Sequence, residues 1–255
     1  MSAVLLIRHD QIGELRLHNP AKMNALSVDM LTQLEDHLAT IERDTTIRAV
    51  MITAEGARAF CTGADINGWG DLGPAEFARH WVRDGHRIFD RLAGLSKPTI
   101  AVINGHAFGG GLELASACDL RVMSPGASLA LPEAGVGIVP GWSGTQRLLR
   151  LLPEPVVKEM ALFGHRIKAD RALAFGFVAA VDDGPRAIAE TLLARAVTLS
   201  PRAVEIAKAM IHAGQGEDRG AMIEALGSAA IAASADRAEG VGAFREKRKP
   251  DFTGK

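Results

Sequence analysis

Short apolar runs that alternate with longer amphipathic runs are the feature that most constrains the fold of this chain. Residues 48–54 (RAVMITA) and 98–105 (PTIAVING) are apolar and rich in β-branched side chains, which is typical of buried strands. Between them, residues 74–98 place large apolar side chains on one side of a long amphipathic helix. Strands that alternate with helices in this way predict an α/β layered fold.

The two ends of the chain carry different patterns. Residues 4–20 predict two short strands around a turn, and residues 27–42 predict a helix. From about Pro153 onward the pattern becomes mostly helical, and no low-complexity linker separates the two parts. We therefore expect an α/β core over residues 1–195 and a helical C-terminal region over residues 196–255.

Charge and cysteine content exclude several classes of protein. The formal net charge is -1, so no overall field attracts nucleic acid or an anionic membrane. The two cysteines, Cys61 and Cys118, are far apart and make neither a disulfide framework nor a zinc site. The first residues lack the basic segment of a signal peptide, and no apolar run is long enough to span a bilayer. We expect a cytoplasmic, soluble protein without nucleic-acid or membrane partners.

Three consecutive glycines, Gly109 to Gly111, lie between a predicted strand and a predicted helix. The first N–H groups of a helix have no partner within it, and glycine lets a ligand approach them closely. Glu113 falls in the first turn, where it suits a reaction in which charge develops on an oxygen while a proton moves nearby. A turn built for close packing, with Glu113 as an ordinary helix charge, is the alternative interpretation.

Two other stretches favour the catalytic interpretation. Residues 59–66 (AFCTGADI) form a second glycine-containing loop after an apolar strand, and the N–H of Ala64 can supply a second donor to the same oxygen. Glu133 lies in an apolar context rich in proline and glycine, where Pro132 restricts the backbone and little nearby can pair the carboxylate. Taken alone, Glu133 also fits an exposed glutamate in a turn.

The order and spacing of these motifs resemble the crotonase superfamily, and within it the chain is most similar to enoyl-CoA hydratases. The resemblance covers nearly the whole chain. It rests on the following stretches in this order: NPAKMNALS, AFCTGADI, KPTIAVINGHAFGGGLELASACDLRV, LPEAGVGIVPGWSGTQRLLR and EGVGAFREKRKPDF. The resemblance implies a spiral of ββα units as the α/β core, with a helical C-terminal part.

The resemblance also implies roles for four residues. The N–H groups of Ala64 and Gly110 match those that bind the thioester oxygen of an acyl-CoA in this family. Glu113 matches the glutamate that activates water as a general base, and Glu133 matches the one that delivers a proton to Cα. The implied reaction is the syn addition of water to a 2-trans-enoyl-CoA, as in fatty acid β-oxidation, without a metal or redox cofactor.

Contacts with the substrate and between subunits follow from the same resemblance. We expect a homotrimer or a dimer of trimers, in which the C-terminal region supports trimerisation and completes the CoA site. The residues that match substrate or CoA contacts are Lys22, Asn24, Ala25, Ala64, Asp65, Ile66, Gly109, Gly110, Pro132, Gly141, Trp142, Phe244 and Lys247.

Two residues depart from the family pattern. Many hydratases have a lysine three positions after the oxyanion alanine, near a CoA phosphate, whereas this chain has Asn67. Family members usually have a small residue at the position of Trp142, which here either walls off the acyl pocket or packs against a helix or a neighbouring subunit. The sequence leaves both interpretations of Trp142 open.

Several alternatives remain at the level of sequence. Within the family, double-bond isomerisation usually needs only one of the two glutamates, whereas hydration coupled to cleavage of an aryl-acyl-CoA stays compatible with both. A CoA-ester binder without catalysis is the alternative from another class. The stretch GWSGT lacks the spacing of a nucleophile elbow, and we predict instead that Ser143 and Gln146 form a capping box at a helix start.

Overall fold

The computed structural model describes residues 2–216 and 219–255. The chain divides into two compact units, the first ending at Glu205 and the second beginning at Ile206. The first unit is a mixed α/β structure, which confirms the predicted fold class. The division falls inside helix α9 (Pro201–Gly214), and each unit is described separately below.

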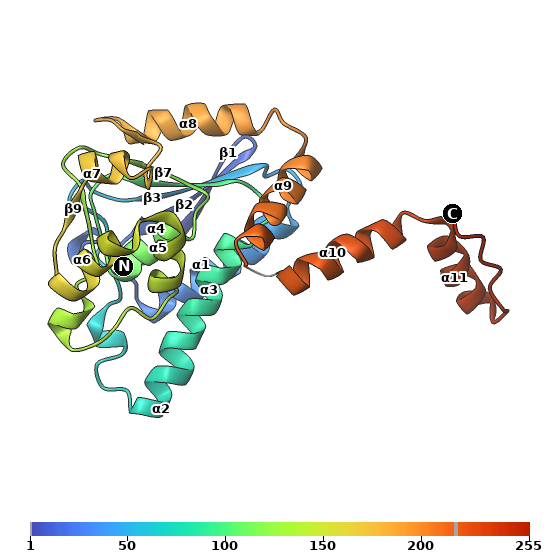
Figure 1. Ribbon diagram of the computed structural model, residues 1–255, viewed down its shortest axis with the longest axis horizontal. Helices are drawn as coiled ribbons and strands as arrows, with labels where there is room; N and C mark the ends of the chain where they lie inside the picture. Colours follow the sequence, from blue (N-terminus) through green and yellow to red (C-terminus); the bar gives the residue numbers. More distant parts are fainter. Residues whose placement is uncertain (1, 217–218) are drawn as a thin grey trace. The chain divides into compact units, whose positions relative to one another are not determined.

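Two sheets organise the first unit (Figure 1). The larger sheet has the strand order β1 (Ala3–His9), β2 (Ile12–His18), β3 (Ala49–Ala54), β5 (Thr99–Ile103), β7 (Leu120–Met123) and β10 (Ala180–Val181). The smaller sheet has the order β4 (Ala59–Cys61), β6 (His106–Phe108), β8 (Ser128–Ala130) and β9 (Ile167–Lys168). β1 pairs with β2 and β8 pairs with β9 in antiparallel fashion, and the remaining pairs are parallel.

Helices follow the strands in a repeating order. The main helices of the first unit are α1 (Val28–Arg43), α2 (Pro74–Glu76), α3 (Arg83–Ala93), α4 (Gly110–Ser116), α5 (Gly144–Leu151), α6 (Glu154–Phe163), α7 (Ala169–Ala174) and α8 (Pro185–Ala196). The strand pairs β3 and β4, β5 and β6, and β7 and β8 each place their first strand in the larger sheet and their second in the smaller one. A helix follows each pair, so the chain winds through ββα units.

The strands of the larger sheet bury both of their faces. In β3, Val50 and Ile52 belong to the main hydrophobic core, whereas Ala49 and Met51 pack in a second cluster with residues of α8. Side chains alternate between the two faces of a strand, so a strand covered on both sides becomes an uninterrupted apolar run. This explains why residues 48–54 read as a buried strand, and Figure 1 shows α8 on the face opposite α1 and α3.

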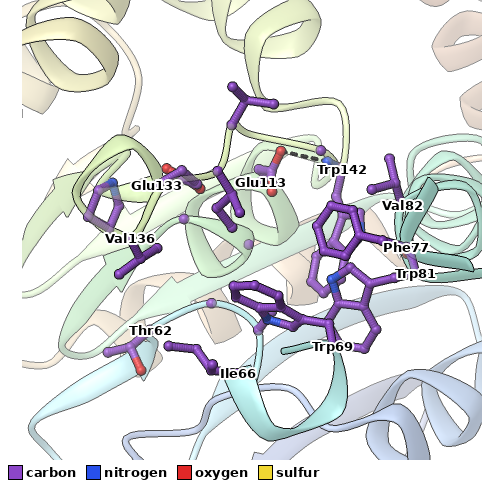
Figure 2. A pocket seen from close by; sticks show the side chains of 18 residues that line it. Thr62, Ile66, Trp69, Phe77, Trp81, Val82, Glu113, Glu133, Val136 and Trp142 are labelled. Carbon is purple, nitrogen blue, oxygen red and sulfur yellow. Dashed lines mark hydrogen bonds between the residues drawn. The ribbon is translucent and has the colours of Figure 1, made fainter. Parts of the chain in front are cut away.

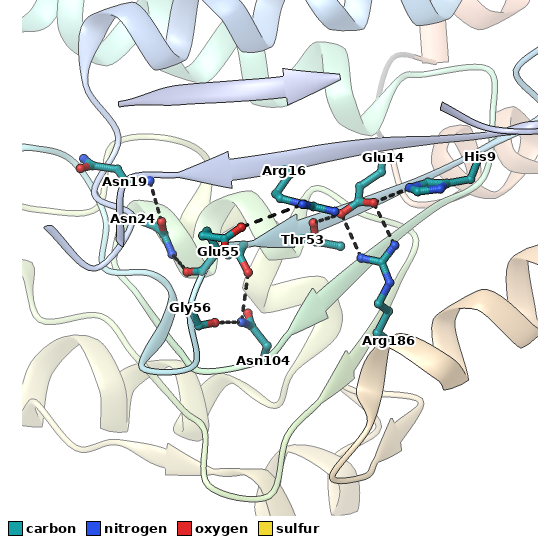
Figure 3. A network of polar contacts seen from close by, with 11 residues as sticks. His9, Glu14, Arg16, Asn19, Asn24, Thr53, Glu55, Gly56, Asn104 and Arg186 are labelled. Atoms are coloured by element: carbon teal, nitrogen blue, oxygen red, sulfur yellow. Dashed lines mark hydrogen bonds and ion pairs between the residues drawn. The ribbon is translucent and has the colours of Figure 1, made fainter. Parts of the chain in front are cut away.

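A buried carboxylate, that of Glu14 on β2, connects two strands of the larger sheet with helix α8 (Figure 3). The Glu14 side chain is fully buried, and its oxygens accept hydrogen bonds from Arg186 at 2.9 and 3.0 Å, Arg16 at 2.9 Å and Thr53 at 2.6 Å. A ring nitrogen of His9 lies 2.6 Å away. Burial alone would raise the pKa of Glu14, but these partners outweigh it and hold the pKa well below its usual range. The carboxylate therefore joins strand β2 to helix α8 as an ion pair.

The second unit contains α10 (Arg219–Ala232) and α11 (Ala235–Glu246) with the C-terminal tail. Ser234 caps α11 by accepting a hydrogen bond from the N–H of Arg237. Arg248 makes two hydrogen bonds to the carboxylate of Glu239, which folds the tail back along α11. No helix within the described residues is long and apolar enough to cross a membrane.

Candidate active site

A pocket with a volume of about 170 Å³ lies in the first unit, where loops from successive ββα units meet (Figure 2). It is lined by Thr62, Gly63, Ala64, Ile66, Trp69, Phe77, Trp81, Val82, Gly109, Gly110, Glu113, Pro132, Glu133, Val136, Ile138, Val139, Gly141 and Trp142. The pocket thus brings together all four residues predicted as catalytic and five further residues predicted as substrate contacts. Among the described residues that line it, only Glu113 and Glu133 have acidic or basic side chains.

The loop after β4 presents one backbone donor. Ala64 forms a parallel bridge with Leu26, in which Leu26 donates to the carbonyl of Gly63 and accepts from the N–H of Asp65, both at 2.8 Å. In such a bridge the N–H of the central residue points away from the partner strand. The N–H of Ala64 is therefore free of Leu26, and Gly63 lies against the backbone nitrogen of Gly110.

Close packing around the start of α4 explains the run of glycines from Gly109 to Gly111. A Cβ on Gly111 would lie 2.1 Å from the carbonyl oxygen of Cys61, so the helix start abuts the backbone of β4. Gly109 has a φ of +50°, and a Cβ there would lie 2.7 Å from Oε1 of Glu133. The glycines thus allow both close packing against β4 and the close approach of the Glu133 carboxylate.

Glu113 is held by the loop before α5. Its side chain is buried, and its Oε1 accepts a hydrogen bond from the backbone N–H of Trp142 (Figure 2) and another from that of Gly144, both at 2.8 Å. Burial raises the pKa of Glu113, whereas the two N–H donors and the charge of Arg147 lower it, and the net direction is upward. A Cβ on Gly144 would lie 2.6 Å from Oε1, so this approach requires glycine.

Glu133 begins the 3-10 helix η4 (Glu133–Val136) and is also buried. Its pKa is raised to about 7, chiefly by burial and also by the nearby charge of Glu113, against the lowering effect of its own backbone N–H. Its Oε2 is buried without a hydrogen-bond partner within the described part of the chain. A carboxyl group in this environment is protonated in a large fraction of molecules at neutral pH and can act as an acid.

Trp142 both packs in the core and walls the pocket, so neither of its two predicted roles excludes the other. It is only 3% exposed, and its ring lies 5.2 Å from the ring of Trp81 and 5.3 Å from that of Phe89. Its Nε1 donates to the carbonyl oxygen of Trp81. A Cβ on Gly85 would lie 2.2 Å from this Nε1, so α3 needs glycine there to admit the indole.

An aromatic wall faces the two carboxylates. Trp69 follows the short 3-10 helix η2 (Ile66–Gly68), and Phe77 and Trp81 come from a π-helical segment, η3 (Phe77–Val82), inside the predicted long helix. The rings of Trp69 and Phe77 meet edge to face at 5.6 Å. The helical pattern did not predict the π-helical turns, which commonly occur at functional sites.

Several residues predicted to contact CoA lie outside the pocket lining. Lys22, in η1 (Pro20–Lys22), forms a 2.6 Å ion pair with Asp65. Asn24 is buried, and its side-chain amide connects two backbone segments by donating to the carbonyls of Glu55 and Ala59 (Figure 3). Ala25 is buried as well. Their contacts with CoA remain predictions.

The remaining predicted contacts lie in the second unit. Phe244 is 87% exposed near the end of α11, and Lys247 follows the helix in a left-handed conformation. Asn67, at the position where many relatives have lysine, donates to the carboxylate of Asp65. The roles proposed for Phe244 and Lys247 at a CoA site also remain predictions.

The predicted capping box at Ser143 is wrong. Ser143 precedes α5, but its φ is +73° and its side chain makes no capping hydrogen bond. A cap that bonds to the N–H groups of its own helix normally has extended backbone, so the left-handed conformation turns this hydroxyl elsewhere. Sequence spacing carried no signal for that conformation, which is uncommon for serine.

Comparison with known proteins shows one family. The family model described as enoyl-CoA hydratase/isomerase matches residues 8–255. The chain is 34% identical to a crotonyl-CoA hydratase of Syntrophomonas wolfei over 99% of this chain and 98% of that protein. Among solved structures, it resembles DspI of Pseudomonas aeruginosa with a TM-score of 0.82 and 33% identity, over 98% of this chain and 96% of that one. It also resembles an enoyl-CoA hydratase of Bacillus anthracis with a TM-score of 0.80 and 32% identity, over 99% of both chains.

Proposed function

The chain belongs to the enoyl-CoA hydratase/isomerase family, and on that premise we propose that it is an enoyl-CoA hydratase. The reaction adds water syn across the double bond of a 2-trans-enoyl-CoA and gives a 3-hydroxyacyl-CoA. The observation that carries the proposal is the presence of two buried carboxylates, Glu113 and Glu133, in one pocket. Hydration needs one group that takes a proton from water and another that gives a proton to carbon.

The environments of the two carboxylates support separate roles. Glu113 has two N–H donors and the charge of Arg147, which favour its ionised form relative to burial alone. In the proposed reaction it takes a proton from water as the water oxygen bonds to Cβ. Glu133, with a pKa near 7, delivers a proton to Cα. Because the two groups interact, their titration belongs to the pair.

Two backbone donors stabilise the charge that develops on the thioester oxygen. The N–H of Ala64 points away from its strand partner, and that of Gly110 lies in the first turn of α4 beside Gly63. We assign the oxyanion hole to these two groups. By comparison with other enzymes, one such donor stabilises the transition state by about 3–4 kcal/mol. The proposed reaction moves only water and protons, so it requires no redox cofactor.

Assembly, location and pathway follow from the family in the same proposal. We propose a homotrimer or a dimer of trimers, a cytoplasmic location and a role in the β-oxidation of fatty acids. Phe244 and Lys247 are proposed to reach a CoA molecule bound to a neighbouring subunit of the trimer. Sedimentation of the purified full chain tests the assembly directly.

The lining of the pocket predicts the class of acyl group. Aromatic and aliphatic side chains surround two carboxylates, and none of the described lining residues is a cation. A second carboxylate at the end of the acyl chain would be buried without a partner beside like charges. We expect crotonyl-CoA or cinnamoyl-CoA to be hydrated with a kcat/KM at least about tenfold above that of 2,3-dehydroadipyl-CoA.

The measurement is the loss of enoyl-thioester absorbance, with mass spectrometry to detect the addition of one water. Preference for the dicarboxylic ester would contradict the predicted acyl class but would leave hydration intact. Movement of a 3-enoyl double bond without hydration would indicate an isomerase. Cleavage of the aryl ester after hydration would indicate a hydratase–lyase, and tight binding of all esters without turnover would indicate a non-catalytic binder.

Trp142 should limit the length of the acyl group. Trp142→Ala removes an indole that closes one side of the pocket, so the kcat/KM ratio of an eight-carbon ester to crotonyl-CoA should rise about tenfold or more. The same change should lower the free energy of unfolding by about 3–5 kcal/mol, because the ring packs against Trp81 and Phe89.

A second substitution isolates the role of the indole. Gly85→Ala alone should disrupt the site, because its Cβ would occupy the position of Trp142 Nε1. In the Trp142→Ala background the same Gly85→Ala change should be tolerated. An unchanged chain-length preference in Trp142→Ala would show that this residue only packs.

A further inference from the structure

Ser143 lies between the two backbone groups that hold Glu113. Trp142 and Gly144, its neighbours in sequence, both donate their N–H groups to Oε1 of Glu113 at 2.8 Å. Two donors from residues i and i+2 can converge on one oxygen only when the residue between them turns the backbone sharply. Ser143 does so with φ +73° and ψ +13°, a conformation that costs a non-glycine residue free energy.

The Ser143 side chain is buried on the other side of this turn, against α3. Its Oγ lies 3.0 and 3.1 Å from the two ring nitrogens of His86 and 3.4 Å from Oδ1 of Asp90. His86 Nε2 lies 3.2 Å from Oδ2 of Asp90, one turn further along the helix. Arg147 of α5 completes the cluster with a 2.5 Å contact to Oδ1 of Asp90. The loop is thereby fastened to α3 through a side chain.

This cluster does not have the geometry of a nucleophilic triad. The hydroxyl lies at nearly the same distance from both ring nitrogens of His86, and Asp90 approaches Nε2, which also contacts the hydroxyl. A triad needs the acid and the nucleophile on different nitrogens. Ser143 is also absent from the pocket lining. The hydroxyl therefore acts on the loop and not on a substrate.

We propose that Ser143 is a positioning residue, whose hydroxyl, anchored on His86 and Asp90, holds the turn that aims two N–H groups at the catalytic base Glu113. The inference rests on the proposed hydratase function. Glycine would adopt the same backbone conformation without strain but would leave the turn unfastened. Serine has the less favourable backbone conformation, but its side chain contacts α3. The same helix carries Gly85, which lies against the Trp142 ring. Helix α3 therefore contacts both the loop that holds Glu113 and the ring of Trp142.

The first test compares Ser143→Ala and Ser143→Gly with the wild type. Both should lower kcat by about tenfold or more while KM changes less than about threefold, because a hydrogen bond to a charged group is weakened. The acidic limb of the pH profile of kcat should move to higher pH, since weaker N–H donation favours protonated Glu113. Arg147 and Glu133 are retained in every variant, so their effect on Glu113 is common to the wild type and the variants, and the shift is read as the difference between them.

Ser128→Ala is the matched control. Ser128 is also buried, and its Oγ lies 3.0 Å from Nδ1 of His106, but this pair lies on β8 and β6 and holds no part of the loop before α5. Its kcat and pH profile should equal those of the wild type. Full kcat and an unshifted profile in Ser143→Gly would overturn the proposal, because the hydroxyl would then be dispensable.

Variants of the anchor provide a second, independent arm. His86→Gln retains a hydrogen-bonding side chain and should keep most of kcat, whereas His86→Phe should lower kcat as Ser143→Ala does. The double variant His86→Phe/Ser143→Ala should have a kcat no lower than that of the weaker single variant, since both changes remove the same contact. Additive losses would show that His86 and Ser143 act separately and would contradict the proposed anchor.

An infrared titration separates this inference from the proposed reaction. The band of the Glu113 carboxyl is identified by the difference between wild type and Glu113→Gln, and its midpoint is followed with pH without substrate. If the wild type hydrates no ester, the proposed function fails, but a midpoint that moves to higher pH in Ser143→Gly still supports the positioning role. An unmoved midpoint overturns that role, whatever the activity.

Discussion

Glu113→Gln should lower kcat by about 10²- to 10⁴-fold, the usual contribution of a general base. The change is nearly isosteric, and the amide oxygen can still accept from the N–H groups of Trp142 and Gly144. Folding and binding of a CoA ester should therefore change little, and KM should stay within about threefold. Steady-state kinetics with crotonyl-CoA measures the effect, and thermal unfolding shows whether the fold is intact.

Glu133→Gln should cause a loss of similar size and should also change the pH dependence. In the wild type, kcat/KM should fall as pH rises through about 7, because burial raises the pKa of Glu133 and the protonated form is the acid. This alkaline limb should disappear from the residual activity of Glu133→Gln. Because the two carboxylates are coupled, Glu113→Gln should shift the limb to lower pH. Unchanged turnover in either variant would remove that residue from the mechanism.

Glu14→Gln should lower the free energy of unfolding by about 2–3 kcal/mol at neutral pH, because a buried carboxylate loses its charge while its arginine partners are partly exposed to solvent. Glu14 is fully buried and joins Arg16 and Arg186. The variant removes the buried carboxylate from both arginines, which retain only the more exposed Glu190 and Glu55, while the volume of the side chain is preserved. Chemical denaturation measures the loss, and activity per folded molecule should remain, since Glu14 does not line the pocket.

The pH dependence of this loss has a defined sign. Glu14 has a lowered pKa in the folded chain, so its contribution is fully present above 4.5, the ordinary pKa of a glutamate, and declines as pH falls below it. The difference between wild type and Glu14→Gln should therefore shrink in acid. Glu190→Gln is the matched control, because Glu190 also pairs with Arg186 but is half exposed, and its loss should stay within about 1 kcal/mol. Equal losses in the two variants would contradict the importance of burial.

Local patterns predicted much of this molecule. The uninterrupted apolar run of β3 and the glycines at the start of α4 are local features, and each follows from what a strand or helix start must bury. The Glu14 network was not predicted, because Arg186 is 172 residues away and only the folded chain brings the two together. The smaller sheet was also missed in detail, because strands of two or three residues carry no clear period.

In the candidate site, too, contacts between residues distant in sequence could not be predicted. The resemblance placed Glu113 and Glu133 together, and the structure finds both in one pocket. It gave no indication of Ser143, because the pattern of a helix cap is local, whereas the contacts that set its backbone come from His86 and Asp90 on a distant helix. Trp142 stood out as unusual, but the glycine on α3 that admits its ring became visible only through packing.

The smaller sheet sets the spacing of three residues of the candidate site. Ala64, Gly110 and Glu133 each lie two or three residues beyond the end of β4, β6 or β8, which are neighbours in that sheet. Adjacent strands are spaced about 4.8 Å apart, a separation from which two N–H groups can converge on a single oxygen. The spacing of the N–H groups of Ala64 and Gly110, the proposed oxyanion donors, is thus set by backbone hydrogen bonding and not by any side chain. Side chains that line the pocket, such as that of Trp142, can therefore differ without changing the spacing of these two backbone N–H groups.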